Sequence, residues 1–170
     1  QSLPLQDKPI LLIEPADNIG GGTPGDATDL LSRLLQSDHE GIVAIINDSA
    51  AAQECHQHHQ GEEIELNIGA KFDDFHGSPI KLKATIQKLS DGKFTLENKQ
   101  SHLASMMGMN IDMGLSAVLI NKQLTLLVTS IKTPPMDLGQ LISQDIDPAK
   151  AKFIVIKAAV SHKDAYDPIA

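Results

Sequence analysis

The residues best suited to catalysis or ligand binding lie together in one glycine-rich loop. Residues 16–28 read ADNIGGGTPGDAT, so two carboxylates, Asp17 and Asp26, flank three successive glycines. Carboxylates on a loop can bind a metal ion, act as a general base or hold a substrate amine. Three adjacent glycines let a partner approach the backbone closely and expose its N–H groups. The loop also carries neutral polar side chains that can hydrogen-bond a ligand: Asn18, Thr23 and Thr28.

Two other interpretations of this loop stay open. Residues 23–26 (TPGD) fit a capping box, with Thr at the cap, Pro at the first helical position and an acid at the third. The loop would then only start a helix, and Asp17 would be an ordinary turn residue. The glycines at 20, 22 and 25 also satisfy the G-x-G-x-x-G spacing of dinucleotide-binding loops, with Asp48 near the place of a ribose-binding acid. The long gap after the preceding apolar run weighs against that fingerprint.

Two further segments carry candidate functional groups. Residues 69–79 form a polar loop in which Lys71 and His76 could face a ligand, although its glycines and proline also suit a long turn. Cys55, His58 and His59 have helical spacing, yet no HExxH or CxxC motif supports a zinc site. We expect that segment to be a solvated helix end. No G-x-S-x-G motif is present, so a catalytic triad is not predicted.

The apolar pattern predicts the elements that position these loops. Residues 10–13 and 42–46 are nearly unbroken apolar runs, typical of buried parallel strands. Helices are predicted over 27–37 and over 49–59, the second with Ser49 as its cap. The glycine-rich loop thus joins a strand to a helix, where open α/β sheets place their ligand sites.

The rest of the chain has a different periodicity. Apolar residues alternate with polar ones over 64–68 and 80–86, which indicates half-buried strands. Residues 117–129 predict a hairpin, and 153–156 a last buried strand. We therefore predict a single α/β domain whose mixed sheet combines an N-terminal parallel βαβα unit with an antiparallel meander.

Composition excludes several classes of partner. The 170 residues carry a formal net charge of −8, which argues against nucleic acid and against an anionic membrane surface. A single cysteine rules out an intrachain disulfide, and a cytoplasmic setting is expected. The start at residues 1–4 (QSLP) lacks Met and a signal-peptide pattern, so we interpret it as a fragment boundary or a processed end.

The loops resemble the conserved blocks of the C-terminal domain of the MlrC metallopeptidase family. Residues 16–28 match that family's Ala-Asp-Asn-Pro-Gly-Gly-Gly-x-Pro-Gly-Asp-x-Thr block, with Ile19 in place of Pro. Its Gly-Gly-Lys…His-Gly-x-Pro block is matched over 69–79, with Ala70 for the second Gly. Further matches cover 90–94, 113–119, 128–130, Lys157 and 168–170. The family's final His and Arg fall on Ser161 and Lys163, so this block departs from the family pattern.

The resemblance implies an accessory part of a zinc-dependent peptidase or amidohydrolase, the named member of which degrades microcystin. In that family the zinc ligands lie in an N-terminal domain, so residues 1–170 would hold no metal and be inactive alone. This domain would close the metal-site cleft of that missing domain, its partner, over a peptide or amide substrate. Asp26 is the first choice for a catalytic or substrate-orienting carboxylate and Asp17 the second. The substrate-binding candidates are Asn18, Gly20, Gly21, Gly22, Thr28, Lys71 and His76.

Two classes of function therefore remain. The first is the accessory half of a metallohydrolase, which needs Asp17, Asp26, Lys71 and His76 to converge on an open face beside an apolar patch. The second is a non-catalytic module that binds a nucleotide or another anion in a pocket around residues 20–25. The sequence leaves the substrate and a homo-oligomeric state open.

Overall fold

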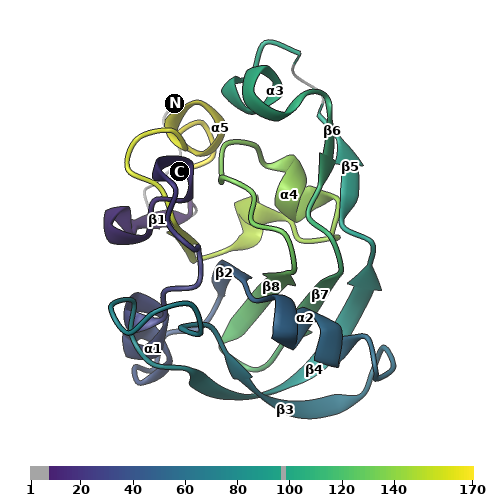
Figure 1. Ribbon diagram of the computed structural model, residues 1–170. Coiled ribbons are helices and arrows are strands. Elements are labelled where there is room, and N and C mark those ends of the chain that lie inside the picture. Colours follow the sequence, from purple (N-terminus) through teal and green to yellow (C-terminus); the bar gives the residue numbers. More distant parts are fainter. Residues whose placement is uncertain (1–7, 97–98) are drawn as a thin grey trace.

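The computed structural model describes residues 8–96 and 99–170. Residues 1–4, where a fragment boundary or processed end was expected, lie outside this range. The main feature is a seven-stranded sheet with short helices against both of its faces (Figure 1). No helix in the described part of the chain is long and apolar enough to cross a bilayer.

The elements have the following bounds. The strands are β1 Ile10–Ile13, β2 Ile42–Asn47, β3 Glu63–Ile68, β4 Ile80–Ser90, β5 Lys93–Thr95, β6 Asn110–Asp112, β7 Ser116–Ile120, β8 Leu124–Thr129 and β9 Phe153–Ile156. The helices are α1 Asp29–Leu35, α2 Ser49–Cys55, α3 His102–Met107, α4 Gly139–Ile142 and α5 Lys163–Tyr166. Turns of 3₁₀ helix span Pro15–Asp17, Ile19–Gly21 and Pro148–Lys150.

The sheet confirms the predicted mixed α/β class. Its strand order is β1-β9-β2-β8-β7-β4-β3, with β1, β9, β2 and β8 parallel and the remaining neighbours antiparallel. The predicted hairpin is β7–β8, closed by a hydrogen bond from Asn121 N to Leu124 O at 3.0 Å. The strand predicted last, β9, lies between β1 and β2, so these two strands of the βαβα unit are not neighbours.

The β3–β4 hairpin brings a distant loop to the parallel half of the sheet. Only the second part of β4, from Thr85, pairs with β7, and a bulge interrupts that ladder between Ile86 and Lys88. The first part of β4 pairs with β3 and curves beneath α2 (Figure 1). As a result the loop between β3 and β4 meets the start of α2, where Gly69 N donates to the Asp48 carboxylate at 2.8 Å.

Alternating side chains of the sheet fill two apolar cores. Ile42, Ala44 and Ile46 of β2 pack with α1, α2 and the β3–β4 hairpin. Val43 of the same strand faces the other core, with α3, α4 and α5. Since both faces are covered, the parallel strands are apolar throughout, as their sequence indicates.

Both predicted helix starts need correction. Helix α1 begins at Asp29 and ends at Leu35, so residues 23–26 do not form its capping box. Helix α2 ends at Cys55 rather than 59, and its cap is Asp48 rather than Ser49, because Asp48 accepts a hydrogen bond from Ala51 N at 3.0 Å. Asp26 and Asp48, near these starts, each have a longer-range partner that local sequence does not reveal.

Candidate functional site

The predicted site residues gather at one edge of the sheet. The glycine-rich loop follows β1, Lys157 follows β9 and Asp48 follows β2, so all three lie at the carboxyl ends of parallel strands. The β3–β4 loop joins them because Thr28 N donates to His76 O at 3.0 Å. The sequence thus identified segments that do meet, at the edge where α/β sheets bind ligands.

Asp17 is buried and shapes the glycine-rich loop. Its side chain is 0% exposed, and its two oxygens accept hydrogen bonds from Gly25 N and Ala27 N, both at 2.8 Å. Burial raises the pKa of Asp17. The Lys157 charge and the two backbone N–H groups together lower the pKa by more than burial raises it, so the net pKa is below its ordinary value. Asp17 is therefore an ionised, buried residue that holds the loop in shape. The sequence-based hypothesis of an open face had expected an accessible carboxylate here.

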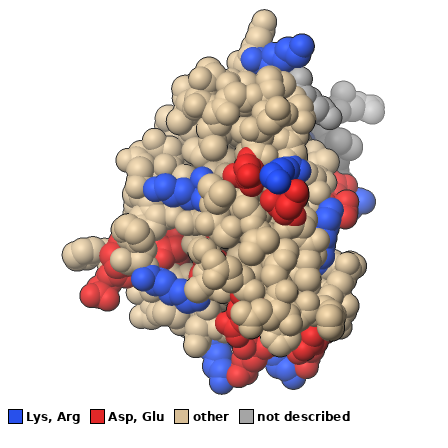
Figure 2. All heavy atoms as spheres, turned by 45° about the vertical axis from the view of Figure 1, so that its right-hand side comes forward, with Lys and Arg blue, Asp and Glu red and all other residues tan. Residues whose placement is uncertain are grey.

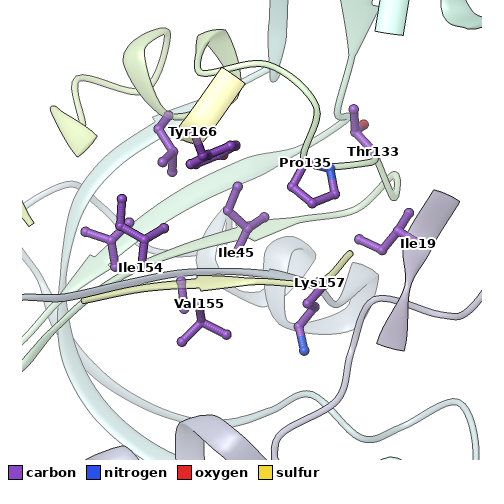
Figure 3. A pocket seen from close by; sticks show the side chains of 11 residues that line it. Ile19, Ile45, Thr133, Pro135, Ile154, Val155, Lys157 and Tyr166 are labelled. Atoms are coloured by element: carbon purple, nitrogen blue, oxygen red, sulfur yellow. The ribbon is translucent and has the colours of Figure 1, made fainter. Parts of the chain in front are cut away.

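Lys157 completes this buried ionic cluster. Its amino group lies 3.1 Å from Asp17 Oδ2 and 2.6 Å from Glu14 Oε2, and donates to Ala27 O at 2.7 Å. The lysine is only 3% exposed. Its stem borders a cavity of about 10 Å³, too small for more than one water, and its amino group points away from Tyr166 (Figure 3). The cluster ties the ends of β1 and β9 to the glycine-rich loop.

Asp26 joins the two predicted loops. It is 4% exposed, and its Oδ2 accepts hydrogen bonds from Lys71 N at 2.8 Å and Phe72 N at 3.1 Å. Its backbone carbonyl accepts a third from Ala70 N at 2.7 Å. Its other carboxylate oxygen, Oδ1, is buried without a hydrogen-bond partner among the described residues. Asp26 thus has a structural role and one uncommitted oxygen.

Asp48 is a site residue whose reach the sequence analysis missed. The sequence placed it only near a ribose-binding acid of the alternative dinucleotide loop, but it caps α2, accepts from Gly69 N and lies 2.8 Å from the Lys71 amino group. Lys71 is consequently held by a 2%-exposed carboxylate rather than directed at a ligand. An acid directly after a buried parallel strand was the available signal, because such ends converge.

The His76 side chain is held within the β3–β4 loop, next to the glycine-rich loop. Its Nδ1 lies 2.8 Å from both oxygens of Asp73, and its side chain is 18% exposed. The hydrogen bond to Asp73 is the main cause of a raised His76 pKa; burial lowers that pKa, and the charges of Asp73 and Asp17 and the backbone of Ala16 raise it. His76 is therefore tied to its own loop and lies beside the glycine-rich loop.

The glycines present the most accessible backbone of the site. Gly20, Gly21 and Gly22 are exposed, but Gly21 N donates to Asn18 O at 2.8 Å and Gly22 N to Ile19 O at 3.0 Å. Lys132 caps the carbonyl groups of Gly22 and Thr23 at 3.2 and 3.0 Å. Two of the three N–H groups are thus used within the turn, which disfavours the alternative of an anion cradle at residues 20–25.

A groove borders the glycine-rich loop on the side away from the β3–β4 loop. A Cβ placed on Gly20 would lie 3.0 Å from Met136 Cε and 3.9 Å from Ser161 Oγ. Met136 and Ser161 line a groove of about 450 Å³ between α3, α4 and α5. The position that holds His in the family block therefore lies at the rim of this groove.

The described residues do not fit a zinc site. No group of three or more His, Cys, Asp or Glu side chains in residues 8–96 and 99–170 could hold a metal ion. The oxygens of Asp17 and Asp48 are occupied by backbone N–H groups and lysines. Cys55 is fully buried, and burial raises its pKa to about 11, while His58 pairs with Glu62 at 2.7 Å. The helical Cys-His pattern is thus not a metal centre.

Charged side chains on the surface are mixed in sign. On the face shown in Figure 2, Lys and Arg lie next to Asp and Glu along the lower and right-hand edges. Exposed ion pairs are also found in the described part of the chain, such as Lys81–Glu65 at 2.8 Å. This face offers no basic stripe of the kind that follows a phosphate backbone.

Comparisons with known proteins place the chain among relatives of similar sequence and fold. The family model described as MlrC C-terminus matches residues 12–170. Microcystinase C of a Sphingomonas species is 23% identical over 152 residues, which cover 89% of this chain and 28% of that protein. The crystal structure of a "putative metallopeptidase" from Mesorhizobium sp. BNC1 aligns with a TM-score of 0.81 and 22% identity, over 98% of this chain and 33% of that one. The chain therefore spans a third or less of the length of these relatives.

Proposed function

The chain belongs to the MlrC C-terminal domain family, and from that membership we propose that it is the accessory domain of a metal-dependent peptidase or amidohydrolase. In this proposal the zinc centre belongs to another, N-terminal part of the parent polypeptide. The present domain closes the cleft of that centre over a peptide or amide substrate. Since the residues that the structure describes do not fit a zinc site, no step of the hydrolysis is assigned to a metal held here.

One observation carries this proposal. The segments that contain Asp17, Asp26, Lys71 and His76 converge on one edge of the sheet, yet their charged groups bind one another and the backbone. The burial of Asp17 and Asp26 departs from the open charged face that the accessory role was expected to need. What supports the role is that the network holds the converging loops rigid, so that a neighbouring domain can pack on them. The exposed backbone of residues 20–22 is the part of this surface left accessible to a substrate.

The individual roles follow from what each side chain has left to offer. Asp26 keeps one oxygen without a hydrogen-bond partner among the described residues, but that oxygen is buried, so we propose that Asp26 orients the substrate through the two loops it joins. Asp17 has both oxygens engaged and acts by holding the loop. Asn18 and the three glycines are proposed to contact substrate, whereas Thr28 supports the loop by donating to Ser78 O at 2.7 Å.

The test uses the parent polypeptide loaded with zinc and assayed on linear peptides. We expect Asp26→Asn to lower kcat by about tenfold or more while zinc content stays at the wild-type level, because the amide keeps the shape but loses the charge. Asp91→Asn, in an exposed turn, serves as the matched control and should retain activity.

Each outcome of this experiment tests a different part of the proposed function. A fully active Asp26→Asn parent removes the substrate-orienting assignment of that residue. Peptide hydrolysis by the isolated 170-residue chain, or a parent without metal-dependent hydrolysis, overturns the accessory role itself.

A further inference from the structure

The β3–β4 loop presents two phenylalanines to solvent. We call residues 71–78 the aromatic loop. Phe72 is 79% exposed and Phe75 is 89% exposed, the highest values among the exposed large hydrophobic residues that the structure describes. The whole chain has only four phenylalanines and no tryptophan. Exposed aromatic pairs of this kind are typical of binding surfaces, because aromatic side chains dominate interface energetics.

Hydrogen bonds to carboxylates fix the backbone of this loop. Asp26 accepts from Phe72 N, and Asp73 accepts from Phe75 N at 2.8 Å and His76 N at 3.2 Å. At the far end, Thr28 Oγ1 donates to Ser78 O. The backbone that carries each phenylalanine is therefore already held in place. This reduces the conformational entropy that is lost when a partner binds.

The charges of the loop indicate the chemistry of the partner. Lys71 is paired with Asp48, and His76 with Asp73. Asp74 lies exposed between the two phenylalanines, and no ion pair to it is found in the described ranges. The surface is therefore apolar with one unneutralised negative charge, which fits an apolar depression with a basic rim.

We propose that the aromatic loop anchors this domain to the metal-binding part of the same parent polypeptide, with Phe72 and Phe75 seated in apolar pockets and Asp74 facing a basic rim. The inference rests on the proposed function. About two thirds or more of each relative's length lies outside the region matched by this chain, so a large partner surface is available in the family. Asp26 ties the aromatic loop to the glycine-rich loop, so the two loops are held in a fixed relation to each other.

The test starts from the intact parent with a protease site introduced ahead of residue 8. After cleavage, we expect the two wild-type pieces to elute together and to bind with a measurable Kd in titration calorimetry. Phe72→Ser with Phe75→Ser should weaken that Kd at least a hundredfold. The control, Met106→Ser with Met107→Ser, changes two residues of α3 that are 51% and 40% exposed and should bind like wild type. Unchanged melting of the isolated Phe variant shows that its fold is intact.

The possible results separate the anchor from the function. Phe-variant pieces that stay together as firmly as wild type overturn the anchor, even if the parent proves to be a metal-dependent hydrolase. Loss of association in the Phe variant supports the anchor, even if the parent shows no hydrolysis and the proposed function falls. Dimerisation of the isolated chain that requires both phenylalanines would assign the loop to a second copy and also overturn the proposal.

Discussion

Replacing Lys157 with methionine should destabilise the domain strongly. Methionine keeps most of the buried stem but removes the charge that serves Glu14 and Asp17, whose side chains are 11% and 0% exposed. Removing one partner of a buried ion pair costs about 3–5 kcal/mol, since the remaining charge stays buried without compensation. Folded domains are stable by only about 5–15 kcal/mol, so the variant would lose a large part of its total stability.

Urea unfolding followed by circular dichroism measures this loss directly. A thermal scan reports the same loss as a temperature. For a domain of this size about 1 kcal/mol corresponds to 2–4 °C, so we expect the melting temperature in that scan to fall by roughly 6–20 °C. The matched control is Lys81→Met, which breaks an ion pair with Glu65 whose side chains are 70% and 53% exposed. That exposed pair should contribute less than about 1 kcal/mol.

A double-mutant cycle isolates the interaction. Adding Asp17→Asn to Lys157→Met removes one uncompensated charge, so the double variant should lose less stability than the two single losses added together. If Lys157→Met unfolds within about 1 kcal/mol of the wild type, or if the two losses simply add, the buried cluster does not hold the site together and this reasoning is wrong.

Three further predictions follow from individual side chains. Because the pKa of Asp17 is lower in the folded chain than its ordinary 3.8, its contribution to stability should be complete above about pH 4 and be lost as pH falls through the folded value; Asp17→Asn should remove that part of the acid dependence in urea titrations. The His76 pKa is raised by Asp73, so NMR should show His76 titrating above 6.5 and returning toward 6.5 in Asp73→Asn; a His76 that titrates at 6.5 in the wild type contradicts the pairing. Cys55, with its pKa raised to about 11 by burial, should resist Ellman's reagent at pH 8 until urea unfolds the chain, and rapid labelling of the native protein would contradict its burial.

The strands were predictable because their pattern is local. Unbroken apolar runs identified β1, β2 and β9, and alternation identified β3 and β4, since the pleat and the burial of each strand dictate these patterns. The placement of β9 between β1 and β2 was not predictable, because strand order depends on packing of the whole chain. The curvature of β4 that brings the β3–β4 loop to the parallel strands was not predictable for the same reason.

The site was predictable as a set of segments but not as a set of roles. The sequence selected the loops that meet, yet it indicated an accessible Asp17 and gave Asp48 no part in joining the loops. Both misjudgements concern hydrogen bonds between residues far apart in the chain, such as Asp48 with Gly69. The buried Lys157–Glu14 pair did leave a signal: opposite charges directly follow two apolar runs, as expected where adjacent parallel strands end together.

The position of β9 has a consequence for synthesis on the ribosome. The first strand pairs only with β9 among the described elements, and β2 also needs it as a neighbour. While residues 153–156 are still inside the exit tunnel, β1 has no partner and the Glu14 carboxylate has no Lys157. The nascent chain can assemble the β3-β4-β7-β8 meander early, but the glycine-rich loop takes its final shape only when translation of the domain is almost complete.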